Sequence, residues 1–349
     1  MFIQVTIAIL VCFIAATVLI YLLIPLAKRI GLVDQPGGRK QHYLSTPLIG
    51  GAAMFVALSF GSLLLPMSLQ PFRAFFAASI LLVFIGVMDD LRELSAKSRL
   101  LVQIIAGIFM VAWGGVSLHN LGNLFFIGEI HLDYTAGLII SICAVIGVTN
   151  AINMLDGVDG LVGTITLLQF LFLIYLALMK GYLIHVGILV LFVPVILEFL
   201  WFNFSFPWRK HARIFMGDAG SMFLGFSLVW FSIYLSQAPH RVASPVVFLW
   251  IMTVPLFDIG ATLFRRILRG RSPFKPDRGH IHHLLLQLGL SKLVIVVILG
   301  SATIAFGLYG VIMDDLGWLP AISFFIFIIF FILYVIVTEI IWHILKDLK

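Results

Sequence analysis

Charge is the property that this sequence has least of. Only 11% of its 349 residues are Asp, Glu, Lys or Arg, whereas 62% are hydrophobic. A soluble globular protein carries about a quarter charged residues, because its surface faces water. A large hydrophobic core cannot explain so wide a shortage, which excludes a soluble protein. A chain solvated by lipid needs charge only where it meets water, so the sequence predicts an integral membrane protein.

Cysteine is also scarce. Cys12 and Cys143 are the only two, and both stand in apolar runs, where a thiol behaves as a small hydrophobe. This excludes a disulfide framework and a cysteine-based zinc site. Residues 1–23 carry no charge and no basic segment before their apolar core. Since about 20 apolar residues cross a bilayer, this stretch is expected to be a first membrane helix and not a cleaved signal peptide.

Apolar runs of membrane-spanning length recur along the chain, with no internal repeat and no low-complexity linker. The sequence therefore predicts one all-α polytopic domain over 1–349 with about eleven transmembrane helices. An odd number places the two termini on opposite sides of the membrane. The predicted spans are 2–24, 48–66, 72–88, 99–117, 135–153, 161–179, 183–200, 219–236, 245–264, 293–312 and 318–344.

Lysine and arginine indicate the orientation, because cytoplasmic loops are enriched in them. With the N-terminus outside and the C-terminus in the cytoplasm, all but three of the 22 basic residues are cytoplasmic; the exceptions are Arg73, Lys180 and Arg241. The formal net charge of +6 reflects this asymmetry. It gives no reason to expect nucleic acid as a partner.

Two adjacent aspartates, Asp89 and Asp90, end the third predicted span on the cytoplasmic side. A helix C-terminus favours cations, and neighbouring carboxylates repel each other unless a metal or a basic group is present. A solvated helix end and a substrate site are both compatible with the pair alone. The same dipeptide at 314–315 stands in a predicted outer loop without polar neighbours, and we interpret it as a topological feature.

A second polar motif ends the fifth predicted span. Asn150, Asn153 and Asp156 follow one another at i, i+3 and i+6 and share roughly one helix face, and Asp159 comes next between two glycines. The alternation that an EF-hand loop needs is missing. Polar groups at membrane depth are costly and usually mark a site, so a functional cluster is favoured over a structural polar patch.

Two further motifs suit an anionic ligand. Asp218 lies between glycines where the eighth span begins; it either caps that helix or holds a magnesium ion beside a bound phosphate. The long cytoplasmic loop at about 265–292 combines arginines with His280, His282 and His283. Lipid headgroups explain the arginines but not three histidines in four residues, for which hydrogen bonding to phosphate is favoured over zinc.

These motifs converge on one membrane face and suit a phosphate-rich ligand with a divalent metal. A transporter or flippase of a phosphorylated lipid is the alternative, because intramembrane acids also occur in carriers. Transporters usually bind their cargo near the midplane, between repeats. The polar residues of this chain stand at cytoplasmic helix ends instead, which favours an enzyme.

Taken together, the motifs resemble those of the polyprenyl-phosphate N-acetylhexosamine-1-phosphate transferases, especially the group that makes undecaprenyl-diphospho-N-acetylglucosamine. They occur in that family's order at 31–36, 46–51, 89–90, 150–161, 215–221 and 272–283. The resemblance implies transfer of N-acetylglucosamine 1-phosphate from UDP-GlcNAc to undecaprenyl phosphate in the bacterial inner membrane, with release of UMP. It also implies Mg²⁺ as cofactor, replaceable by Mn²⁺, and a homodimer. The product would enter O-antigen or a related cell-envelope polysaccharide, and the sequence leaves the pathway open.

The resemblance also implies roles for single residues. Asp218, with Asn153, would bind the metal. Asp89 and Asp90 would face the lipid phosphate, and Asp156 and Asp159 the nucleotide; these four are the implied catalytic residues. Substrate binding is implied for His280, His282, His283, Arg266, Arg278, Asn150 and Thr46. The related peptidoglycan transferase has consecutive histidines where this chain has His-Ile-His-His, a departure that favours an N-acetylglucosamine donor over a muramyl pentapeptide.

Overall fold

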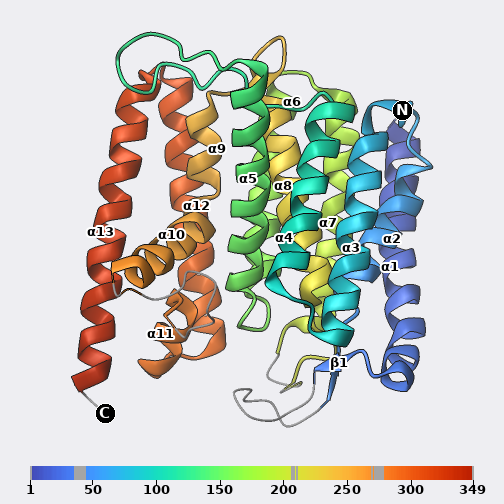
Figure 1. Cartoon of the computed structure of the whole chain (residues 1–349). Helices are drawn as coiled ribbons and strands as arrows, with labels where there is room; N and C mark the ends of the chain where they lie inside the picture. The colour runs from blue at the N-terminus through green and yellow to red at the C-terminus, as the bar shows by residue number, and fades with distance from the viewer. Residues whose placement is uncertain are drawn as a thin grey trace.

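The computed structural model describes residues 2–34, 45–205, 209, 211–268, 270 and 279–347. Most of these residues lie in helices that run side by side, and the two ends of the chain lie at opposite ends of the bundle (Figure 1). The predicted all-α architecture is confirmed. Which end of the bundle faces the cytoplasm stays a prediction from the basic residues.

Helices and short strands follow one another along the chain, and most helices are apolar on all sides. The long helices are α1 Phe2–Ile30, α3 Arg73–Arg92, α5 Tyr134–Leu155, α6 Leu161–Met179, α7 Leu183–Asn203, α8 Gly217–Gln237, α12 Lys292–Asp315 and α13 Pro320–Asp347. The shorter ones are α2 Gly50–Ser62, α4 Ala96–Ile108, α9 Pro245–Ile251, α10 Thr253–Leu268 and α11 Ile281–Gln287. A 3₁₀ turn Gln70–Phe72, a π-helical turn Phe109–Trp113 and two strands, β1 Val33–Asp34 and β2 Thr46–Pro47, complete the described structure.

Polar caps explain where several of these helices begin. The side chains of Ser95, Asp133 and Ser291 accept hydrogen bonds from backbone N–H groups in the first turns of α4, α5 and α12. A cap of this kind satisfies one of the four N–H groups that a helix start leaves without a partner. The sequence therefore fixes these starts locally, before any packing between helices.

The predicted count of eleven spans differs from the structure in two places. Among the described residues, nine helices are long and apolar enough to cross a membrane, or ten if the bent pair α9–α10 is one span. The predicted span 48–66 is instead the 13-residue helix α2. At 1.5 Å per residue α2 is about 20 Å long, short of the roughly 30 Å of a bilayer core. It needs no greater length because it packs against α1, α7 and α8.

The other difference is the break between α9 and α10, where the axis bends by 81°. Pro255 has no N–H with which to bond the carbonyl of Ile251 four residues earlier. That carbonyl instead accepts a hydrogen bond from Nε2 of Gln169, which α6 supplies at 3.2 Å. The bend turns α10 across the bundle between α5 and α13 (Figure 1).

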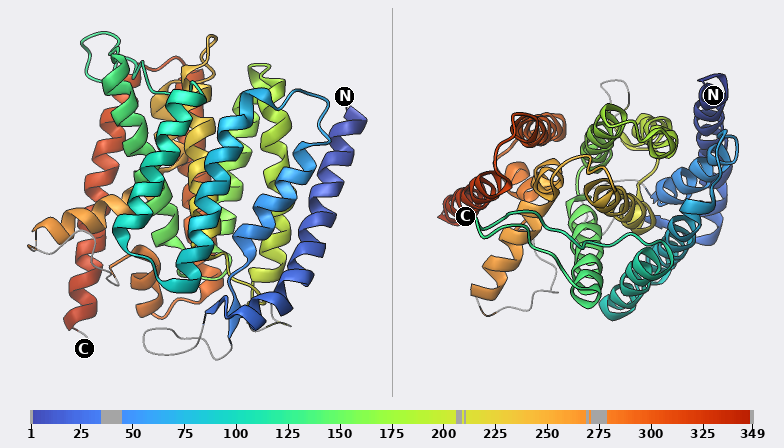
Figure 2. Two further views of the ribbon diagram at one scale, coloured as in Figure 1. Left: turned by 45° about the vertical axis from the view of Figure 1, so that its right-hand side comes forward. Right: turned by 90° about the horizontal axis from the view of Figure 1, so that it is seen from above.

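Helix α8 is the central element and is almost entirely buried. Its backbone comes very close to its neighbours: a Cβ atom would lie 2.0 Å from the Gly220 backbone nitrogen if added to Gly51 of α2, and 2.3 Å from Ala219 if added to Gly86 of α3. On α8 itself, a Cβ at Gly225 would lie 2.8 Å from Thr149 of α5. Small residues therefore let α2, α3 and α5 surround the start of α8 (Figure 2).

Short strand pairings hold the segment just before α8. β1 and β2 pair antiparallel, with Asp34 opposite Thr46. Leu48 forms a parallel bridge with Phe215, whose N–H donates to the Pro47 carbonyl at 2.8 Å. The start of α8 is thus tied to the chain that leads into α2.

A methyl group at Gly86 is expected to destabilise the protein, because it would press on the α8 backbone, which cannot move aside as a side chain could. We predict that Gly86→Ala lowers the free energy of unfolding by about 1–3 kcal/mol. The readout is the melting temperature of detergent-purified protein. Gly147→Ala is the matched control, since a Cβ there meets nothing within 4 Å. Equal melting temperatures for the two variants would contradict the close packing of α3 on α8.

Candidate active site

Asp90 and Asp218 meet at the start of α8. Both oxygens of the Asp90 carboxylate accept a hydrogen bond from the Asp218 backbone N–H, each at 3.1 Å. Gly217, between them, has φ +69°, and a Cβ there would lie 2.4 Å from Asp90 Oδ2. Asp90 thus lies at the positive N-terminal end of α8. This placement offsets the unfavourable position of the acid at the C-terminal end of α3.

Asp89 turns the other way and shares a cation with Asp218. Its Oδ1 accepts from the Leu94 N–H at 2.6 Å, and its Oδ2 lies 3.1 Å from Nη1 of Arg99. The same nitrogen of Arg99 lies 3.5 Å from Oδ2 of Asp218. Arg99, in the first turn of α4, therefore bridges two carboxylates that come from α3 and α8. In the sequence alone, Arg99 is one of the many basic residues that indicate orientation.

The two asparagines of α5 reach different helices. Asn153 donates from Nδ2 to Asp218 Oδ1 at 2.6 Å and to the Ser221 hydroxyl at 2.9 Å. Asn150, one turn earlier, donates to Oε1 of Gln103 on α4 at 2.8 Å. Asn153 therefore fixes the Asp218 carboxylate, and its role as a metal ligand stays a prediction. Asn150 joins α5 to α4, and its role with substrate also stays a prediction.

The loop after α5 carries Asp156 and Asp159 in different surroundings. Asp159 accepts from the Ser205 hydroxyl at 3.0 Å and pairs with Nζ of Lys292, at the start of α12, at 2.7 Å. Asp156, which follows the last residue of α5, is exposed on one side. The protein atoms packed around the rest of the Asp156 carboxyl, and then the charges of Asp218 and Asp159, raise its pKa to about 7.

The histidines lie at the start of α11. The rings of His280 and His282 are parallel, with centroids 6.0 Å apart, and His283 is 4.1 Å from His282. His282 is 1% exposed, and neither of its ring nitrogens has a hydrogen-bond partner among the described residues. A Cβ on Gly157 would lie 2.2 Å from His282 Nε2, so this ring packs directly against the Asp156 loop.

The environment of His282 favours its neutral form. Burial, followed by the charges of His283 and His280, lowers its pKa to about 3, against the opposing charge of Asp258. A buried polar group without a partner costs about 1–3 kcal/mol. The two ring nitrogens are therefore buried without a hydrogen bond beside the loop that carries Asp156 and Asp159.

The remaining predicted site residues are Thr46, Arg266 and Arg278. Thr46 is buried in β2, beside the strand segment that leads into α8. Arg266 is buried near the end of α10. Arg278 lies outside the described residues. The substrate contacts predicted for these three residues stay predictions.

The cluster of Asp89, Asp90 and Asp218 (the acid cluster) suits a divalent cation that shares its ligands with a substrate. Nowhere in the described ranges do three His, Cys, Asp or Glu side chains form a ready metal site. Mg²⁺, however, commonly takes one or two carboxylates and completes its shell with water and substrate phosphates. Asp218, held by Asn153 and next to Asp89, offers such carboxylate oxygens, whose charge Arg99 balances here.

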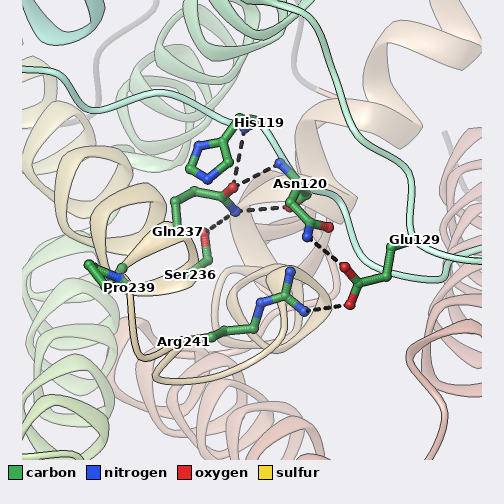
Figure 3. Close-up of a pocket in the computed structure, with 8 residues that line it drawn as sticks. His119, Asn120, Glu129, Ser236, Gln237, Pro239 and Arg241 are labelled. Carbon is green, nitrogen blue, oxygen red and sulfur yellow. Dashed lines mark hydrogen bonds and ion pairs between the residues drawn. The ribbon is translucent and has the colours of Figure 1, made fainter.

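A polar cavity of about 330 Å³ lies at the other end of α8 (Figure 3). Gln237 accepts from the backbone N–H groups of His119 and Asn120, and donates to the Asn120 carbonyl and the Ser236 hydroxyl. Asn120 in turn donates to Glu129 at 2.9 Å. These groups satisfy one another and tie the loop between α4 and α5 to α8, which indicates a structural role.

The second aspartate pair also lies away from the acid cluster, as predicted. It ends α12, and Oδ1 of Asp314 accepts from the Ser244 N–H just before α9 at 3.2 Å. The expectation that this pair lacks polar neighbours was wrong in this detail. Asp314 supports the start of α9.

Comparison with known proteins identifies the family. Residues 72–236, which include the acid cluster and the Asp156 loop, match glycosyl transferase family 4. The chain is 34% identical to the undecaprenyl-phosphate alpha-N-acetylglucosaminyl 1-phosphate transferase of Haemophilus influenzae, over 97% of this chain and 95% of that protein. The chain belongs to glycosyl transferase family 4.

Other family 4 relatives carry the same name. The protein from Yersinia pestis is 32% identical over 93% of this chain and 88% of its own length. The protein from Escherichia coli strain K12 is 30% identical over 97% and 92%. The family resemblance expected from the motifs is thereby confirmed over nearly the whole chain.

Low pH is expected to lower the stability of the folded protein through His282. Between pH 6.5 and about 3 the unfolded chain binds a proton on this ring that the folded chain does not. The contribution of His282 to stability therefore falls as pH falls through that window, by up to about 1.4 kcal/mol per pH unit, whereas the raised pKa of Asp156 acts in the opposite direction. Melting temperatures between pH 7.5 and 5 measure the effect, and His282→Gln should flatten the decline.

The control is His131→Gln, which changes a largely exposed ring and should keep the wild-type slope. If His282→Gln declined as steeply as the wild type, the ring would not be held neutral in the fold.

Proposed function

We propose that the protein transfers N-acetylglucosamine 1-phosphate from UDP-GlcNAc to undecaprenyl phosphate, giving undecaprenyl-diphospho-GlcNAc and UMP. The relatives carry this activity in their names. The observation that carries the proposal is the arrangement at the start of α8. Asp218, Asp89 and Arg99 lie together there, and the unpartnered His282 packs against the adjacent Asp156 loop.

The reaction is a displacement at phosphorus. An oxygen of undecaprenyl phosphate attacks the β-phosphorus of UDP-GlcNAc, and a new P–O bond forms. The bond from that phosphorus to the oxygen bridging the α- and β-phosphates breaks, and UMP leaves with the electron pair. The sugar stays on its phosphate throughout. The second pKa of a phosphate monoester is about 6, so the acceptor is largely dianionic at neutral pH and needs no strong general base.

Arg99 offsets the negative charge of Asp89 and Asp90 where the acceptor phosphate would bind. Asp89 and Asp90 alone would repel an incoming phosphate dianion. Arg99 lies 3.1 Å from Asp89 and supplies a cation that can attract a phosphate oxygen, while Asp90 is bonded to the Asp218 N–H. Asp89 and Asp90 thus border the acceptor phosphate, with Arg99 as the group that contacts it.

A divalent cation, Mg²⁺ or Mn²⁺, would be held by Asp218 with Asn153 beside it. When bound, it neutralises charge on the diphosphate and stabilises the leaving phosphate. The hydrogen bond from Asn153 at 2.6 Å keeps one Asp218 oxygen in place. Positioning bonds of this kind to a metal ligand typically affect metal affinity or activity by about 10–100-fold.

The donor would bind at the Asp156 loop and α11. The ring of His282 packs on this loop, so a small movement of the loop would open its two unbonded ring nitrogens to the donor. Lys292 pairs with Asp159 of the same loop. The sequence His-Ile-His-His favours N-acetylglucosamine as the donor sugar. His280, His283, Arg266 and Arg278 would complete the contacts with the sugar nucleotide.

We place the reaction at the cytoplasmic face of the bacterial inner membrane, where the basic residues gather. The product would feed a cell-envelope polysaccharide such as O-antigen, and the enzyme would act as a homodimer. The transporter alternative is not favoured, because the aspartates and histidines of the candidate site lie at one end of the bundle and the relatives are named as transferases.

Asp218→Asn is expected to lower turnover roughly 100-fold or more, because it removes the metal-holding charge, and Asn153→Ala to lower it roughly 10–100-fold. The assay measures UMP and lipid-linked sugar formed by purified protein from a panel of UDP-sugars with undecaprenyl phosphate and Mg²⁺. Asp315→Asn, an exposed acid at the other end of the bundle, is the matched control.

Direct displacement also predicts no exchange of labelled UMP into UDP-GlcNAc without the lipid acceptor. Exchange under that condition would show a phospho-enzyme with an aspartate nucleophile. Failure of the wild type to form lipid-linked GlcNAc would overturn the proposed function itself.

A further inference from the structure

Asp258, on α10, is a buried acid outside the cluster described above. The residue is 2% exposed, and three donors converge on its carboxylate. Oδ2 lies 2.8 Å from Nδ1 of His280, and Oδ1 accepts from the Ile281 N–H at 2.8 Å and from the Tyr334 hydroxyl at 3.2 Å. A buried carboxylate is costly unless it is hydrogen-bonded, so these three contacts keep it in place.

Two of the three donors belong to the segment that starts α11. Asp258 holds the ring of His280 and the backbone of Ile281, and the guanidinium of Arg265, two turns further along α10, donates to the Gly279 carbonyl. Arg265 also donates to Thr262 at 3.1 Å. Helix α10 thus forms hydrogen bonds with three consecutive residues, 279–281, directly before His282.

The position of His282 depends on these hydrogen bonds. Its ring packs against Gly157, where a side chain could not fit, and its two nitrogens have no partner in the described part of the chain. A displacement of the preceding residues would move these nitrogens relative to the Asp156 loop. Substitutions at Asp258 should therefore change the affinity for a ligand that hydrogen-bonds to His282.

The third donor links the C-terminal helix to the same point. Tyr334 lies near the middle of α13, a helix largely exposed toward lipid that packs against α10 and α11. Figure 1 shows α13 at the edge of the bundle, with α10 running from it toward α5. Its hydroxyl is the donor that connects α13 to the carboxylate holding His280.

We propose that Asp258 and Tyr334 are positioning residues for the transferase, which fix His280 and His282 against the Asp156 loop so that His282 meets the sugar nucleotide. The inference rests on the proposed function. Neither residue touches the substrate in this account. They act through the hydrogen bonds that connect α13, α10 and α11.

The test compares Asp258→Asn and Tyr334→Phe with the wild type, using UDP-GlcNAc and undecaprenyl phosphate as separately varied substrates. An amide at 258 keeps one acceptor oxygen and turns its NH2 either toward the Ile281 N–H and the Tyr334 hydroxyl or toward His280 Nδ1, so at least one of the three contacts is lost or reversed. KM for UDP-GlcNAc should rise roughly tenfold or more in Asp258→Asn and roughly threefold in Tyr334→Phe. KM for undecaprenyl phosphate should stay within about twofold of the wild type, because the acceptor side is built by α3 and α4.

Two control variants make the same chemical changes, Tyr to Phe and Asp to Asn, at residues that do not contact the start of α11. Tyr309→Phe removes a buried hydroxyl that has no partner in the described ranges, and Asp314→Asn changes an acid at the other end of the bundle. Both should keep KM for UDP-GlcNAc within about twofold of the wild type. Melting temperatures identify any variant that fails to fold, and Tyr334→Phe, the milder change, then carries the test.

A double-mutant cycle separates positioning from general stability. If Asp258 acts through His282, Asp258→Asn should add little to the KM increase caused by His282→Ala. Additive effects, or folded variants with lower kcat and an unchanged KM for UDP-GlcNAc, would overturn the proposal. A wild type that forms no lipid-linked GlcNAc would instead refute the proposed function, so the two failures can be told apart.

Discussion

The site depends on the close approach of the α8 backbone to α2, α3 and α5. Gly51, Gly86 and Gly225 leave no room for a side chain at these contacts. This packing brings the end of α3 beneath the start of α8, so that Asp90 lies at the positive end of the α8 dipole. The same packing places Asn153 within hydrogen-bonding distance of Asp218.

Electrostatics then decides what this end of the bundle can bind. Several acids come together there, and the structure offsets their repulsion with specific groups: the α8 N-terminus for Asp90, Arg99 for Asp89 and Asp218, and Lys292 for Asp159. A cluster balanced in this way can exchange its cation contacts for a metal ion and phosphate oxygens at little cost. The polar cavity at the other end of α8 lacks this capacity, because Gln237 and Asn120 already satisfy its hydrogen bonds.

The sequence predicted the membrane class, the helical fold and the acids, since hydropathy and costly polar residues can be read along the chain. It did not predict that α2 is short, which follows from packing. Pro255 stands inside the predicted span 245–264, but the bend there is completed by Gln169 of α6, a partner distant in sequence that donates to the Ile251 carbonyl. In the sequence, Arg99 indicates only the orientation of the chain, and Asp258 stands alone within an apolar run. Their roles come from partners distant in sequence, which no local pattern encodes.

An experimental structure of the protein with UDP-GlcNAc and Mn²⁺ tests the central claim most directly, because the anomalous signal of manganese locates the cation. We expect the metal roughly 2.2 Å from an Asp218 oxygen, with the diphosphate between that carboxylate and His282. A manganese peak away from Asp218, or a nucleotide in the cavity at the far end of α8, would contradict the account.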